Sequence, residues 1–91
     1  MDQAGKTVTY NKNANFYVST DLTGTGNNAS HTLSVYAGRM NFNGDTSFTN
    51  ITKGENGKSA YGVSALGDPK QTENPVLNFA GNSLKINVVT D

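Results

Sequence analysis

The sequence lacks cysteine, has only two prolines and is poor in charged residues. Without cysteine, disulfide bonds and thiolate metal sites are excluded. Charged residues make up 15% of the chain, with seven basic and seven acidic side chains and a formal net charge of zero. Nowhere do lysines or arginines cluster into the concentrated positive field that a nucleic-acid binder needs. These absences argue against a disulfide scaffold and against a nucleic-acid partner.

Long apolar runs are missing as well. No stretch approaches the roughly 18 consecutive apolar residues of a membrane-spanning helix, so we expect no membrane insertion by this segment. Residues 1–6 have no apolar region of the kind found in signal peptides, so a secretion signal would lie outside this sequence. With low hydrophobicity but zero net charge and little proline, the composition favours an ordered β-protein rich in Asn and Thr over a disordered chain.

Short runs of alternating apolar and polar residues predict β-strands. Residues 33–37 place three apolar side chains on one face, and residues 61–65 repeat this arrangement. Clusters of Gly, Asn and Asp bound each run, as is usual between strands. No segment has the i, i+3, i+4, i+7 spacing of an amphipathic helix. The chain is therefore predicted to be all-β.

Comparison of the sequence with itself reveals repeats. Residues 8–16 match residues 40–48 position for position: apolar, polar, aromatic, Asn, a turn pair, two small residues and Phe. A third copy of this repeat, at 77–84, has one residue fewer before its final apolar residue, Leu84. A second repeated block also occurs, in which residues 31–37 resemble residues 59–65. The spacing is about 32 and then about 37 residues, which suits a solenoid once variable loops at 24–28 and 54–58 are subtracted.

These repeats predict a right-handed parallel β-helix of about three coils, at roughly 8–39, 40–76 and 77–91, in a single solenoid segment over 1–91. The alternative is a small antiparallel β-sandwich, because Asn43-Gly44 and Gly81-Asn82 would suit two-residue hairpin turns. Strand direction separates the two: parallel contacts between residues about 32–37 apart support coils, whereas contacts across the Asn-Gly turns support hairpins.

A family resemblance is carried by three segments of the sequence: MNFNGD at 40–45, SAYGV at 59–63 and LNFAGNSLKI at 77–86. They are similar to the coils of autotransporter passenger domains, β-helical proteins that bacteria export across the outer membrane. The similarity covers about residues 8–89 and rests on repeat style. Such passengers usually run to several hundred residues before a C-terminal membrane barrel. The resemblance therefore implies a fragment of roughly three coils, secreted or associated with the outer membrane at the cell surface.

No catalytic residue, cofactor site or metal site is predicted. His31 is isolated from other potential ligands, so we expect it on the surface. Gly44-Asp45 and Asp68-Pro69 match neither the Ca²⁺-binding nonapeptide repeat nor an EF-hand, so they are interpreted as turns. Residues 62–67 come nearest to a Gly-x-Ser-x-Gly elbow but lack its second glycine.

The aromatic side chains fall into two groups. Five recur at equivalent repeat positions and are expected to stack in the core, coil above coil, with a carbohydrate-binding platform as the alternative: Tyr10, Phe16, Phe42, Phe48 and Phe79. Tyr17 and Tyr36 fall on the opposite phase from their apolar neighbours and are expected to be exposed. An aromatic contact to a ligand should be sought at these two first.

The sequence thus favours a non-enzymatic structural or adhesive module, acting in adhesion or self-association. Its expected partners are a second copy, stacked end to end because open ends expose unpaired backbone groups, or a host or cell-surface protein or glycan. One alternative is a fragment of a β-helical polysaccharide-acting enzyme, for which Arg39, Lys53 and Lys85 are the nearest candidates although they do not repeat in register. Another is a small antiparallel surface or pilus-type module.

Overall fold

The computed structural model describes residues 1–22, 28–54, 58–67, 69–70 and 73–90. Most of the two predicted variable loops, and Asp68 of the predicted turn, lie outside these residues. The described chain is all-β, with about 73% of it in strands and no helix. Its eight strands are β1 (Asp2–Tyr10), β2 (Ala14–Leu22), β3 (Ala29–Val35), β4 (Ala37–Phe42), β5 (Thr46–Gly54), β6 (Ser59–Ala65), β7 (Val76–Phe79) and β8 (Leu84–Thr90).

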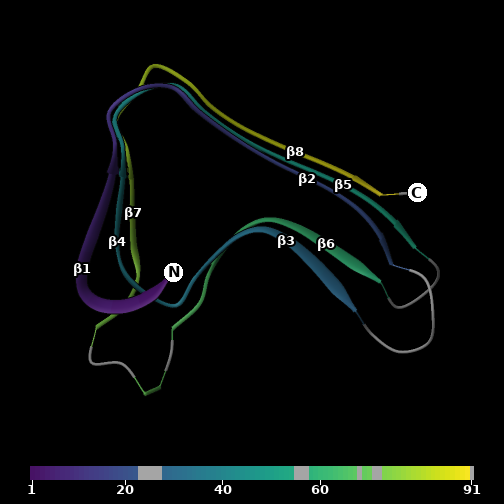
Figure 1. The fold of residues 1–91 in the computed structure, drawn as a ribbon, viewed down its shortest axis with the longest axis horizontal. Coiled ribbons are helices and arrows are strands. Elements are labelled where there is room, and N and C mark those ends of the chain that lie inside the picture. Colours follow the sequence, from purple (N-terminus) through teal and green to yellow (C-terminus); the bar gives the residue numbers. More distant parts are fainter. Residues whose placement is uncertain (23–27, 55–57, 68, 71–72, 91) are drawn as a thin grey trace.

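The strands form three small sheets, in the orders β1-β4-β7, β2-β5-β8 and β3-β6 (Figure 1). The chain therefore runs three times along the same path: a first pass (β1–β3), a second (β4–β6) and a third (β7–β8). The Cα positions extend 37 × 33 × 12 Å, and the shortest dimension is the direction in which the passes stack (Figure 1).

Every hydrogen-bonded strand pair in the described chain is parallel. The antiparallel alternative is therefore wrong. Asn43-Gly44 and Gly81-Asn82 each turn the chain from one sheet into the next, so the strands on either side of them do not pair with one another. Parallel partners need a long connection between them, and here it is a complete pass of the chain.

The first predicted repeat is confirmed by the strand register. Val8 pairs with Met40 and Phe16 with Phe48, as the match of 8–16 with 40–48 requires. The third copy was misaligned: Leu84 pairs with Thr46, and the residue opposite Phe48 is Ile86. The third corner, residues 80–83, is one residue longer than the second, residues 43–45, where the sequence predicted a shorter one. A Leu in a strand that alternates Leu, Ile and Val offers no unique anchor.

The second predicted repeat was misaligned by two residues. The sequence placed His31 opposite Ser59, whereas the structure pairs His31 with Tyr61, Leu33 with Val63 and Val35 with Ala65. A slip of two residues leaves each side chain on the same face of the strand, so the alternation alone could not detect it.

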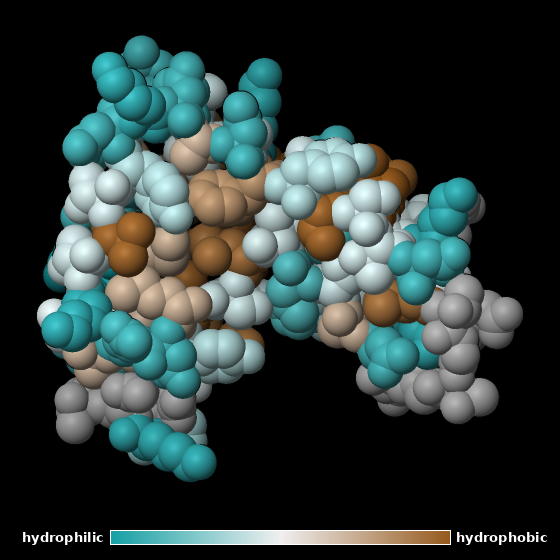
Figure 2. Space-filling model, in the orientation of Figure 1, coloured by the Kyte–Doolittle hydropathy of each residue, from teal (hydrophilic) through white to brown (hydrophobic). Residues whose placement is uncertain are grey.

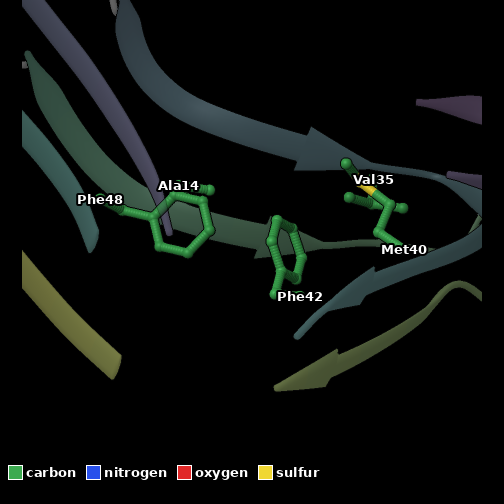
Figure 3. Packing of buried hydrophobic residues seen from close by; sticks show 5 residues of the cluster. All are labelled: Ala14, Val35, Met40, Phe42 and Phe48. Atoms are coloured by element: carbon green, nitrogen blue, oxygen red, sulfur yellow. The ribbon is translucent and has the colours of Figure 1, made fainter. Parts of the chain in front are cut away.

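The core lies where the three sheets face one another and is built from aromatic stacks. Its buried members are Ala14, Val35, Met40, Phe42 and Phe48 (Figure 3). Phe42 stacks on Tyr10 and Phe79, with ring centroids 5.4 and 4.9 Å apart, and Phe48 stacks on Phe16 at 5.1 Å. The two stacks meet edge to face, with 5.9 Å between Phe42 and Phe48. The predicted stacking of aromatic residues is confirmed, but the predicted core position holds fully only for Phe42 and Phe48, because Tyr10 and Phe16 are partly buried and Phe79 is exposed.

One fully buried residue of the second pass is polar. Asn50 lies between Val18 and Val88 in register. Its Nδ2 donates to the backbone oxygens of Ser30 and Tyr61, at 3.1 and 3.0 Å, and its Oδ1 accepts from the Thr52 hydroxyl. Because a buried amide is costly unless it is bonded, these contacts fix the β5 strand against β3 and β6.

Candidate functional site

The edge formed by β7 and β8, called here the third-pass edge, is the main uncovered apolar surface that the register identifies. Both strands pair on one side only, and every residue of β8 is exposed. Ile86 is 54% exposed, whereas Phe48, directly opposite it on β5, is fully buried. Figure 2 shows the opposite face of the flat stack, where β1 and β2 lie in front, and there too apolar surface lies towards the centre with hydrophilic residues around much of the rim. A further strand paired with β8 would cover those β8 side chains that lie opposite the buried residues of β5.

The opposite edge, formed by β1 and β2 and called the first-pass edge, differs at its corner. Lys12 occupies the corner position that is glycine in the other two passes, at Gly44 and Gly81. A Cβ on Gly44 would lie 2.5 Å from the backbone carbon of Lys12, and one on Gly81 would run into the backbone of Gly44. At this corner the Cβ direction points at the preceding pass, and only glycine allows the passes to stack this closely.

Polar side chains on the outer surface tie the passes together. Asn41 Nδ2 donates to Thr9 Oγ1 at 3.3 Å, and Asn78 Nδ2 donates to Asn41 Oδ1 at 2.9 Å, which links all three passes. At the corner, Asp45 Oδ1 accepts from the backbone N–H groups of Asn82 and Ser83 at 2.9 and 3.1 Å. The carboxylate thus satisfies the donors of the longer third corner.

Two of the hollows on the outer surface are lined entirely by residues that the structure describes. One, of about 440 Å³, adjoins a bulge in β1, where Gly38 has a φ of 93° and β1 gains extra residues between the pairs Asp2–Ala37 and Thr7–Arg39. Lys6 and Arg39 line it together with Glu73, whose Oε1 accepts from the Gly5 N–H at 2.6 Å. The other, of about 290 Å³, lies at the corner between Asn13 and Lys85. Both are open and mixed in polarity.

The basic residues considered for an enzyme stand apart in register. Arg39 is opposite Thr7 and Val76, Lys53 is opposite Asp21, and Lys85 is opposite Ser47. They belong to three different columns, and Arg39 and Lys85 line two different hollows.

The remaining predicted surface residues lie as expected. Tyr17 and Tyr36 are exposed, and so is His31, whose ring stacks on Tyr61 with centroids 4.7 Å apart and whose Nδ1 lies 2.9 Å from Ser64 Oγ. Among the described residues, no three His, Asp or Glu side chains are grouped closely enough to hold a metal ion. Asp68 lies outside the described residues.

No family model, curated protein or solved structure matches this chain. Within the described ranges there is also no helix of the length and apolarity needed to cross a membrane.

Two features of the site were missed by reasoning from the sequence. Asn50 gave no signal, because Asn is common on the surface of this chain and its burial depends on contacts with β3 and β6. Lys12 could have been noticed, since the match of 8–16 with 40–48 already sets it against Gly44. A lysine opposite a glycine in an otherwise similar repeat indicates a steric difference between passes.

Proposed function

We propose that the chain is a segment of a right-handed parallel β-helix that serves as a non-enzymatic structural or adhesive module of a secreted or cell-surface protein. The observation that carries this proposal is the parallel register of residues 30 to 38 positions apart, in which β8 has a partner on one side only among the described strands. Edge strands with free N–H and C=O groups are templates for pairing with another chain. This geometry supports adhesion or self-association by strand addition.

The exterior supports a binding role over a catalytic one. Its side chains are mainly amides and hydroxyls that bond to the same kind of residue in the next pass, as Asn41 does with Asn78. A groove for an acidic polysaccharide would instead place cations in neighbouring passes of one column. Arg39 and Lys85 lie in different columns, which favours the adhesive interpretation.

Beads coated with the full chain test this proposal. We expect the coated beads to clump with one another or to adhere to cultured epithelial cells, whereas beads coated with albumin should do neither. The same preparation should release no reducing ends from a panel of neutral and acidic polysaccharides. Absence of both clumping and adherence, or turnover of any polysaccharide, would contradict the proposed function.

A further inference from the structure

The smaller hollow, of about 290 Å³, lies at the corner where the chain turns into the β2-β5-β8 sheet (Figure 1). Its lining comes from all three passes and includes Asn13 and Asn15 of the first, Asp45 and Ser47 of the second and Lys85 of the third. Asn15, Ser47 and Lys85 are paired in register and alternate with inward residues, so they face outward. Further passes would pair with the strand edges and would lie beside this face, so the hollow would stay open in a longer β-helix.

Three side chains of the hollow are each held by one polar atom and keep a second polar atom unused. Asn13 Oδ1 accepts from the Asp45 N–H at 2.9 Å, and Asn15 Oδ1 accepts from the Ser47 hydroxyl at 2.6 Å. Asp45 Oδ1 accepts from two N–H groups of the third corner. Within the described residues, Asn13 Nδ2, Asn15 Nδ2 and Asp45 Oδ2 have no hydrogen-bond partner. The contacts between passes thus fix two amide donors and one carboxylate acceptor before a ligand binds.

This set of free groups suits the hydroxyls of a neutral sugar. A hydroxyl is both a donor and an acceptor, so neighbouring hydroxyls of one sugar can donate to Asp45 Oδ2 and accept from Asn15 Nδ2. The charged side chains that line the hollow are Asp45 and Lys85, whose charges sum to zero, so an anion gains no net attraction there. The volume is at the lower end of small-molecule sites, so one sugar residue fills it.

An exposed aromatic ring lies on the same face of the sheet. Tyr17 follows Asn15 by two residues, which places both side chains on one face about 7 Å apart along β2. Tyr17 is 66% exposed, more than any other large hydrophobic side chain in the described chain. Such a ring offers a flat apolar surface to the C–H groups of a sugar. Tyr36, the other tyrosine expected to be exposed, belongs to the connection between β3 and β4, outside this sheet.

We propose that the corner hollow and Tyr17 form a binding site for a neutral glycan. One sugar residue is held in the hollow by Asp45 and the two asparagines, and the adjoining residue packs against Tyr17. The site rests on the adhesive function proposed above and names neutral glycans as its ligand class. Because the hollow is open, a single site binds weakly, with a Kd of about 1 mM, and many copies on one surface multiply the affinity.

Heteronuclear NMR of the full chain, titrated with the methyl glycosides of glucose, galactose and mannose, tests the site. At least one of these glycosides should shift the amide signals of residues 13–17 and 45–47 at millimolar concentration. Methyl glucuronide, which has a carboxylate in place of the hydroxymethyl group of methyl glucoside, should bind no more tightly than methyl glucoside. Unshifted corner signals with all the neutral glycosides, or clear preference for the glucuronide, would overturn the proposal.

Two isosteric variants separate binding from folding. Asp45→Asn keeps an acceptor for the third corner but replaces the free acceptor by a donor, and should weaken binding of the best glycoside by about tenfold or more. Asn15→Asp keeps the acceptor for Ser47 but loses the free donor, with the same expected effect. Asn74→Asp, at an exposed residue of the other hollow, is the matched control and should bind normally. Undiminished binding by both corner variants would remove these side chains from the site.

The contribution of Tyr17 is measured with a disaccharide of the best-bound sugar. Tyr17→Ala should weaken binding of the disaccharide by about threefold or more and leave binding of the methyl glycoside nearly unchanged. Tyr36→Ala is the control and should change neither. Equal effects of the two tyrosine variants, or equal losses for the two ligands with Tyr17→Ala, would overturn the second contact.

Failure of the site and failure of the adhesive function give different results. Beads coated with Asp45→Asn that adhere to epithelial cells as strongly as beads coated with the unmodified chain would leave the function standing and remove the corner as its surface. Beads coated with the unmodified chain that neither clump nor adhere, although a glycoside shifts the corner signals, would remove the function and leave the site.

Discussion

The second and third passes have similar sequence patterns but different surroundings. Phe48 and Ile86 occupy the same column, yet Phe48 is fully buried between two neighbours and Ile86 is half exposed. β5 is paired on both sides, whereas β8 is paired on one. The comparison shows that a repeat pattern specifies which side chains point inward but not how well they are covered. That depends on whether another pass lies against them.

The largest expected difference between the passes is the cost of removing a core side chain. Phe48→Ala should lower the free energy of unfolding by about 3–5 kcal/mol, because it opens a cavity between the two aromatic stacks. Ile86→Ala removes a half-exposed side chain and should cost about 1 kcal/mol. Urea unfolding followed by circular dichroism measures both values. Equal losses would show that the third pass is as well covered as the second.

In the column formed by Val18, Asn50 and Val88, only the second pass contributes a polar side chain. Asn50→Val should cost about 2 kcal/mol, because the backbone oxygens of Ser30 and Tyr61 lose their side-chain donor. Val88→Asn, the reverse change at an exposed position, should cost less than about 0.5 kcal/mol. The same unfolding experiment compares them. A stabilised Asn50→Val chain would mean that the buried amide is not needed to hold the sheets together.

The corner glycines give a smaller effect. Gly81→Ala should cost about 1–3 kcal/mol, since its Cβ would enter the backbone of the second pass. Gly67→Ala is the control: its Cβ would lie 3.9 Å from Asn74 Oδ1, and the change should stay within about 0.5 kcal/mol. Thermal melting curves of the two variants would contradict the tight corner if their midpoints were the same.

The smallest effect is expected at the Asp45 carboxylate. Asp45→Ala should cost about 1 kcal/mol, because the N–H groups of Asn82 and Ser83 lose their shared acceptor. Asp45→Asn keeps an acceptor oxygen and should recover part of that loss. Amide hydrogen exchange at residues 82 and 83 reports the change directly, and unchanged protection in both variants would remove Asp45 from the account of the third corner.

Much of the fold could be predicted from the sequence, and the errors in the predicted strand alignments have a common cause. The pairing of Tyr10 with Phe42 and of Phe16 with Phe48 was accessible because an aromatic residue followed by an Asn corner is locally distinctive. The alignments of Leu84 and His31 failed because a strand of alternating apolar residues looks the same after a slip of two. The length of the loop before each strand decides between two such alignments, and this length varies between the passes.

The functional features were harder to predict than the fold. Within the described residues β8 pairs on one side only and is exposed, which no local pattern records. The role of Lys12 depends on the direction of a Cβ atom towards another pass. Both are properties of stacking, so they become visible only when residues 32 or more positions apart are brought side by side.

The central claim is that the three passes stack in parallel register, and spin labels test it most directly. The chain has no native cysteine, so Tyr17, Thr49 and Asn87 can be replaced in pairs by labelled cysteine. These three residues form one outward column, in which Tyr17 pairs with Thr49 and Thr49 pairs with Asn87. Neighbouring pairs should show strong dipolar broadening for strands about 4.8 Å apart, and the pair 17 and 87 should show weaker coupling at about twice that spacing. Weak coupling between 17 and 49, or stronger coupling between 17 and 87, would contradict the stacked passes.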